Sequence, residues 1–327
     1  MHEIIYYTKT RRNPALRKRR RIRFILILII FFPVIYLLIT KLPSPVTENV
    51  TGIINPLAQN VINKGLEVLH PDVNSKNLEE IVQKELKETK GTYAIFIKNL
   101  KTRERYYFNE QKAFDAASIY KLFVMGTVFS QIQEGKFNEK DILSQDVEVL
   151  NKKFNIASES AELSEGAITI PVQTALERMI TISDNYSALL LTEKVRLASV
   201  TDFLRKNSFL NSKMGGADTA PLTTAYDIGI FFEKLYKGEI VDRNYSDKML
   251  VLLKGQKKND KLPKYLPKGL VFAHKTGELG GISHDGGIAY AKKADYIIVI
   301  FSLTSSQVLA DEKIANISRV VYNYFIN

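Results

Sequence analysis

The spacing of apolar residues predicts strands near both ends of the chain and helices between them. A helical repeat covers residues 77–90 and is ended by Gly91, and the segments TYAIFIKNL and ERYYFN, separated by KTR, are typical of a hairpin. Helical spacing dominates residues 118–236. The short segments VFAHKTG, GGIAYA and DYIIVIFSLT indicate further strands, and residues 307–325 a final helix.

This order of elements predicts an α/β (α+β) fold for residues 76–327. Strands from the two ends of the segment form one antiparallel sheet, helices cover the sheet, and a mainly helical lobe is inserted between the two sets of strands. At roughly 250 residues, the segment can bury the core of one domain. We expect the functional site in a groove between the sheet and the lobe.

The residues before this domain predict a membrane anchor. Residues 24–40 form a run of 17 without a charge, close to the minimum for crossing a bilayer core. Segment 1–23 is strongly basic, so we expect it to stay cytoplasmic and the rest of the chain to lie outside the membrane. Residues 41–75, with four prolines among polar residues, predict a stalk. A cleaved signal peptide is the alternative, but no A-x-A site follows Thr40.

The position of the charges argues against a nucleic-acid partner. The formal net charge is +11, but residues 1–41 hold ten basic residues and one acidic residue, which leaves 36 basic and 34 acidic residues in the rest. A nearly neutral domain lacks the basic surface of a nucleic-acid-binding protein. The chain has no cysteine and no H-E-x-x-H pair, and we expect no disulfide, metal or organic cofactor.

Two polar motifs lie in the predicted helical region. In AASIYKLF, Ser118 and Lys121 are three residues apart at a helix start and therefore on one face. A lysine can deprotonate a serine once burial or a nearby cation makes it partly neutral; a surface lysine after a helix-start serine is the alternative. In ITISDNYSALLL, Ser183 could relay a proton to a leaving nitrogen and Asn185 could hold a substrate amide, whereas the alternative is a helix N-cap.

A third motif, FAHKTGELGGISHDGG, leads from a predicted strand into a glycine-rich turn. Lys275 and Thr276 offer a cation and a hydroxyl to a substrate carboxylate, and Gly277 lets a ligand approach the backbone. An edge strand here can also pair with an extended peptide. An ordinary exposed strand end is the alternative.

The histidines around this motif suggest another kind of site. His274 and His284, together with Asp285, could complete a Ser-His-Asp triad. No G-x-S-x-G elbow presents a serine to them. We therefore expect structural hydrogen bonds from both histidines.

In this order, the three motifs make residues 75–327 resemble the penicillin-recognising serine enzymes, which comprise class A β-lactamases and penicillin-binding proteins. The resemblance implies a β-lactamase/transpeptidase-like fold. It implies that Ser118 forms an acyl-enzyme, that Lys121 is the general base and that Ser183 relays the proton. It also implies substrate binding by Asn185, Lys275, Thr276 and Gly277, and an oxyanion hole formed by the backbone N–H groups of Ser118 and Glu278.

One feature of class A β-lactamases is missing. Their E-x-x-L-N loop holds the glutamate that activates the deacylating water, but no glutamate occurs between Ser199 and Thr224. The nearest sequence, NSFLN, has Asn207 in that place, and Asp218 is more typical of a turn than of a substitute base. Loss of a general base costs a factor of about 100 to 10,000 in the step it serves, which argues against fast penicillin hydrolysis.

We therefore predict a single-pass serine hydrolase of the class A β-lactamase family at the bacterial cytoplasmic membrane, with its catalytic domain outside. It would form an acyl-enzyme with β-lactams, which it hydrolyses, or with D-Ala-D-Ala-like stem peptides of peptidoglycan, and would contact lipid through residues 24–40. A D,D-carboxypeptidase or penicillin-binding protein with slow deacylation is the alternative. A non-catalytic cell-wall binder or β-lactam sensor is a third hypothesis, disfavoured because segment 1–23 holds no recognisable signalling domain.

Overall fold

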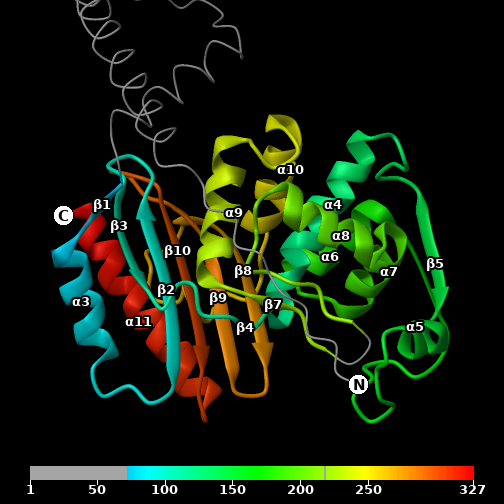
Figure 1. The fold of residues 1–327 in the computed structure, drawn as a ribbon, viewed down its shortest axis with the longest axis horizontal. Helices are drawn as coiled ribbons and strands as arrows, with labels where there is room; N and C mark the ends of the chain where they lie inside the picture. The colour runs from blue at the N-terminus through cyan, green and yellow to red at the C-terminus, as the bar shows by residue number, and fades with distance from the viewer. Residues whose placement is uncertain (1–71, 217–218) are drawn as a thin grey trace, which may run out of the picture. The chain divides into compact units, whose positions relative to one another are not determined.

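A six-stranded sheet forms the centre of the part of the chain that the computed structural model describes, residues 72–216 and 219–327 (Figure 1). Its order is β1-β3-β2-β10-β9-β8, and every pair is antiparallel except β1 with β3. The strands are β1 (Val73–Asn74), β2 (Thr92–Asn99), β3 (Glu104–Phe108), β8 (Val271–Leu279), β9 (Ile282–Tyr290) and β10 (Tyr296–Leu303). The predicted sheet from both ends of the domain is confirmed, and β1 adds a parallel pair from within the segment predicted as a stalk.

Helices cover both faces of this sheet, and the central strand β10 is accordingly apolar along most of its length. Helices α3 (Lys76–Leu86) and α11 (Gln307–Ile326) pack on one face, against Ile95 and Ile97. On the opposite face, Phe96 packs against α9 (Ala225–Lys237) and belongs to the core of the helical lobe. Alternate residues of one strand therefore serve two cores, as the twofold side-chain repeat of a strand requires.

The helical lobe lies between β3 and β8 in sequence, as predicted. Its elements are α4 (Lys121–Gln133), β5 (Ile142–Asp146), α5 (Val147–Lys153), β6 (Ala167–Pro171), α6 (Val172–Thr181), α7 (Asn185–Val195), α8 (Leu197–Lys206) and, next to the sheet, α9 and α10 (Arg243–Lys254). The small antiparallel sheet of β5 and β6 interrupts a region predicted as helical. The helix predicted for residues 77–90 ends earlier, at Leu86, and Gly91 adopts a φ of 108° in the turn that enters β2.

Close backbone approaches join the lobe to the sheet. Gly229 of α9 lies against β2, where an added Cβ would be 2.4 Å from the ring of Phe96. The short pair β4 (Phe114–Asp115) and β7 (Leu222–Thr223) connects the start of the lobe to the loop before α9. Any side chain larger than that of glycine would clash at Gly229, so this position sets how closely α9 lies against β2.

No helix within the described ranges is long and apolar enough to span a membrane. The predicted cytoplasmic segment 1–23, the predicted anchor 24–40 and most of the predicted stalk lie outside these ranges, as does Asp218. The predictions for those residues therefore stay predictions.

Candidate active site

A pocket opens where the lobe meets β8. It lies beside the 3-10 turn η1 (Ala117–Tyr120), the start of α7, the end of β8 and the loop after α10. The residues that line it are Ser118, Glu162, Ile182, Ser183, Asp184, Asn185, Lys258, Thr276 and Glu278. Five predicted site residues therefore line one pocket, although the chain separates the first from the last by 160 positions.

The backbone is strained on both sides of this pocket. Ala117, immediately before the half-buried Ser118, has a φ of 42°, and Ser183 has a φ of 63°. Residues other than glycine rarely adopt such angles, which cost roughly 1–3 kcal/mol each and tend to occur at functional sites. The backbone around the S-x-x-K motif differs from the predicted single helix. Ser118 lies in the 3-10 turn, and Lys121 is the first residue of α4.

Lys121 is fully buried and bonded only to uncharged oxygens. Its Nζ donates to the backbone O of Ser183 at 2.6 Å, to Asn185 Oδ1 at 2.7 Å and to Ser183 Oγ at 3.3 Å. Burial lowers the pKa of Lys121 to about 7, although the carboxylates of Asp184 and Glu162 act in the opposite direction. A substantial fraction of this lysine is therefore neutral near pH 7.

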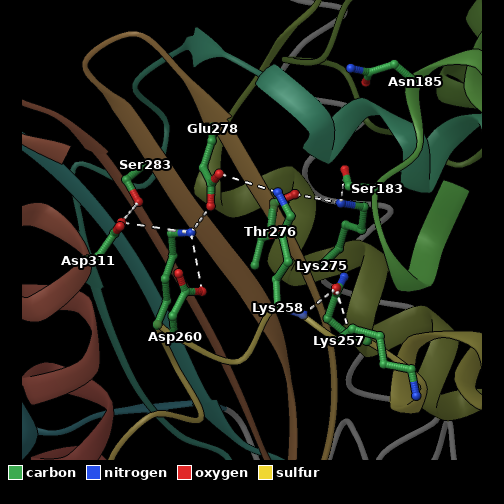
Figure 2. Close-up of polar contacts among 12 residues, drawn as sticks. Ser183, Asn185, Lys257, Lys258, Asp260, Lys275, Thr276, Glu278, Ser283 and Asp311 are labelled. Carbon is green, nitrogen blue, oxygen red and sulfur yellow. Dashed lines mark hydrogen bonds and ion pairs between the residues drawn. The ribbon is translucent and has the colours of Figure 1, made fainter. Parts of the chain in front are cut away.

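Lys275 reaches the same hydroxyl from β8. Its Nζ donates to Ser183 Oγ at 2.9 Å and to the backbone O of Thr276 at 2.7 Å, and its side chain is also fully buried (Figure 2). Burial, followed by the positive charges of Lys121 and Lys258, lowers the pKa of Lys275 well below its ordinary value. The Ser183 hydroxyl thus lies between two amines and can pass a proton between them.

Ser118 and Lys121 have no hydrogen bond to each other within the described residues. An ammonium group has three N–H donors, and Lys121 directs them at the three oxygens given above. A neutral amine has two donors and a lone pair, so loss of the proton frees one contact and creates an acceptor for the Ser118 hydroxyl. Hydrogen bonds of catalytic groups commonly tighten only when substrate is bound.

Gly277 allows the strand to lie against the turn that carries Ser118. An added Cβ would be 2.9 Å from Ile119 Cγ1 and 3.2 Å from the backbone O of Ala116. The glycine of the K-T-G motif is therefore required by contact between β8 and η1. This contact also brings the backbone of Glu278, the next residue, to the pocket that Ser118 lines.

The carboxylate of Glu278 is engaged away from the reacting groups. It accepts a hydrogen bond from the buried Lys261 and lies 3.5 Å from Lys258 Nζ, while Asp311 accepts from Ser283 nearby (Figure 2). Burial acts to raise the pKa of Glu278, but the two lysines outweigh it and hold this pKa below its ordinary value. The side chain is therefore an ionised partner of the lysines, which leaves the backbone N–H for the predicted oxyanion role.

The histidines form no triad with Ser118. His274 Nδ1 lies 2.9 Å from Asp285 Oδ1, and His284 Nε2 lies 3.0 Å from the backbone O of Asp115. Both rings are buried, and burial lowers the pKa of His284 to about 4. These are the structural hydrogen bonds expected from the sequence.

The S-D-N triplet contains a helix N-cap, the structural alternative given for this motif. Asp184 caps α7, where its Oδ1 accepts from Ser187 N at 2.6 Å. Because the cap fixes the start of the helix, Ser183 and Asn185 on either side of it project towards Lys121. A structural N-cap and a polar site thus share three consecutive residues.

The described residues between Ser199 and Thr224 supply no carboxylate to the pocket. Asn207, at the position of the missing glutamate, donates from Nδ2 to the backbone O of Phe203 at 2.9 Å and does not line the pocket. Farther along, Ser212 donates to Asp227 at 2.7 Å, which fixes the loop to α9. This part of the chain is therefore tied to the helices beside it.

Two charged residues of the pocket, Glu162 and Lys258, were missed by the sequence analysis. Glu162, on the loop between α5 and β6, accepts a hydrogen bond from Asn185 Nδ2 at 2.6 Å. Lys258, on the loop after α10, lies beside Glu278 and Thr276 (Figure 2). Both are exposed charged residues in polar segments, so neither has a distinguishing local pattern.

Comparisons with known proteins agree with this fold. A family model described as the beta-lactamase enzyme family matches residues 77–325. The fold is similar to that of PBP-A, with a TM-score of 0.70 and 23% identity over 78% of this chain and 98% of that one. A point variant of PBP-A, determined as an acyl-enzyme complex with penicillin G, gives a TM-score of 0.69 and 21% identity over 78% and 98% of the two chains. A beta-lactamase from Sphaerobacter thermophilus gives 0.67 and 20% over 76% and 96%. No curated protein sequence matches the chain.

Proposed function

The chain belongs to the beta-lactamase enzyme family of serine hydrolases, and from this premise we propose that Ser118 is acylated by β-lactams or by D-Ala-D-Ala-like peptides. Both kinds of substrate present a carboxylate next to a scissile amide. In the step proposed, the Ser118 oxygen bonds to the carbonyl carbon, the amide C–N bond breaks, and the serine proton passes to the leaving nitrogen. Water then hydrolyses the ester, which releases the acid and restores the serine.

The observation that carries this proposal is the pair of buried lysines that share the Ser183 hydroxyl. Lys121, with its pKa lowered to about 7, takes the proton of Ser118 as general base. Ser183 then relays the proton to the leaving nitrogen, since its Oγ already contacts both amines. The N–H groups of Ser118 and Glu278 stabilise the developing oxyanion.

Deacylation is proposed to be the slow step. Two of the carboxylates that line the pocket are engaged, because Asp184 caps α7 and Glu278 binds Lys261. The third, Glu162, precedes the S-D-N motif, whereas the glutamate of class A enzymes follows it. None of these carboxylates corresponds to the glutamate that activates the deacylating water in class A enzymes. This favours a D,D-carboxypeptidase or a slow β-lactamase over a fast β-lactamase.

We further propose that the enzyme acts at the outer side of the bacterial cytoplasmic membrane. Residues 24–40 would anchor it, residues 41–71 would extend it from the bilayer, and the peptidoglycan stem peptide would be its natural substrate. The support is the uncharged run, the basic residues that precede it and the neutral domain that follows.

The test is to incubate the full-length chain in detergent with a fluorescent penicillin and to follow its mass over time. We expect a Ser118-dependent adduct that persists for many minutes, with Ser118→Ala as the control. An adduct that clears at once indicates a β-lactamase, and release of D-Ala from a stem peptide separates a peptidase from a sensor. If no adduct forms at any pH between 6 and 9, the proposal is wrong.

A further inference from the structure

We infer that Glu162 selects acyl donors with a protonated amine on the side of the scissile bond opposite their carboxylate. This inference rests on the proposed function and adds a class of substrate to it. Glu162 and Asn185 lie on the helical-lobe side of the pocket, whereas Lys258 and Thr276 lie next to the end of β8 (Figure 2, for the last three).

The charges give the pocket a direction. Lys258 and the hydroxyl of Thr276 attract an anion at the β8 end, and Ser118 and Ser183 lie in the same pocket. Glu162 supplies a carboxylate at the other end. A substrate held with its carboxylate at the β8 end therefore presents the acyl side of its scissile bond to Glu162.

Glu162 has room for a cationic partner. No ion pair within residues 72–216 and 219–327 includes it, and its side chain is exposed. Its hydrogen bond to Asn185 Nδ2, at 2.6 Å, holds the carboxylate at the pocket wall and leaves other oxygen lone pairs available. A protonated amine can bind there without displacing Asn185.

A bound cation would also act on the general base. The negative charge of Glu162 is among the influences that raise the pKa of Lys121. A cation beside Glu162 offsets this charge, so more Lys121 becomes neutral while the aminated substrate is bound. Selection by charge and activation of the base therefore act in the same direction.

The experiment compares penicillin G with ampicillin, which is penicillin G with one added α-amino group. Second-order acylation rate constants are measured at pH 6.5 for the full-length wild type and for Glu162→Gln, in which the amide oxygen can still accept from Asn185. We expect the ampicillin to penicillin G ratio to fall about three- to fivefold in the variant, as for the loss of one exposed ion pair. Because the readout is a ratio within each protein, an effect on Asn185 that both substrates share cancels.

The matched control is Glu165→Gln, which removes one negative charge from the same loop outside the pocket and should leave the ratio unchanged. Higher ionic strength should lower the ratio in the wild type but not in Glu162→Gln. If the ratio is the same in the wild type and in Glu162→Gln while both proteins still form Ser118-dependent adducts, this inference is wrong and the proposed function stands. If neither β-lactam forms a Ser118-dependent adduct, the proposed function fails and this inference fails with it.

Discussion

Three fully buried lysines lie near one another in this domain, in two contrasting environments. Lys121 and Lys275 donate to a hydroxyl and to carbonyl oxygens, and the pKa of each is lowered. Lys261 donates to the carboxylate of Glu278, and its pKa is raised even though burial acts to lower it. Burial is common to all three, so the charge of the hydrogen-bond partner decides whether the lysine is a base or a fixed cation.

Both environments involve residues of one strand, β8. Lys275 belongs to β8 and contacts the pocket hydroxyl, while Glu278, near the end of the same strand, is tied to Lys261. The ion pair fixes the loop after α10 to the strand whose backbone borders the pocket. Lys275, whose amine has no carboxylate partner, can take part in proton transfer, whereas Lys261, which is paired with a carboxylate, holds the strand in place.

The largest effect should come from replacing Lys121, the predicted general base, which has no carboxylate partner. In Lys121→Met, the acylation rate with a fluorescent penicillin should fall by about 100- to 10,000-fold, since general-base catalysis is lost. The free energy of unfolding at pH 7 should not decrease, because a buried amine with a lowered pKa is replaced by an apolar side chain. A denaturant titration checks the second expectation. Acylation within tenfold of the wild type would contradict the role given to Lys121.

Replacement of Lys261, which is paired with a carboxylate, should instead lower the stability of the fold. Lys261→Met leaves the carboxylates of Glu278 and Asp311 without their buried cation, so we expect a loss of about 3 kcal/mol in the free energy of unfolding. Lys264→Met is the matched control, because Lys264 makes an exposed pair with Glu312 and should cost less than about 1 kcal/mol. Equal losses in the two variants, measured by urea denaturation, would remove the contrast between the two environments.

A pH series should distinguish the two environments without any mutation. Acylation should rise roughly tenfold between pH 6 and pH 8, with a midpoint near 7, as Lys121 loses its proton. For stability, the pKa of Lys121 is about 7 when folded and 10.5 in its ordinary state. The unfolded chain then binds more protons between these values, so stability should rise with pH across this window.

Lys261 has the opposite sign. Its pKa is raised on folding, so its contribution is fully present below its ordinary value of 10.5 and is lost only as the pH rises beyond it. Unfolding free energies measured from pH 7 to pH 10 should therefore rise in the wild type and rise less in Lys121→Met. A wild-type stability that falls with pH over this range would contradict the lowered pKa of Lys121.

Local spacing was sufficient to predict β2, β3, β8, β9 and β10, the fold class and the motif residues that line the pocket. The strands β2 and β10 leave a clear signal because they are covered on both faces and are rich in apolar residues, whereas β8 is recognised by its K-T-G motif. Other features carry a weaker signal. Helix α10 begins at an Asp242 N-cap, whose side chain accepts from Tyr245 N at 2.9 Å, a pattern that the sequence analysis could have used.

The electrostatic neighbours of the site could not be predicted in this way. Glu162 bonds to a residue 23 positions later, and Lys261 to one 17 positions later, so each contact depends on how the loops cross the domain. The 3-10 turn at Ser118 likewise depends on the strained Ala117 and on β4 beside it. Tertiary packing determines these features, and single-residue patterns do not encode it.

The smallest expected effect concerns Lys258, the exposed cation next to both environments. Its charge is among the influences that lower the pKa of Lys121, and its own side chain is 42% exposed, so solvent screens it. In Lys258→Gln, the pH midpoint of acylation should move to higher pH by at most about half a unit, the size of an exposed charge interaction.

Lys257→Gln, which removes the neighbouring charge outside the pocket, should leave the midpoint unchanged. About 1 M salt should shrink the difference between the midpoints of the wild type and Lys258→Gln, because the Debye length falls to roughly 3 Å. A shift to lower pH would contradict this role of Lys258.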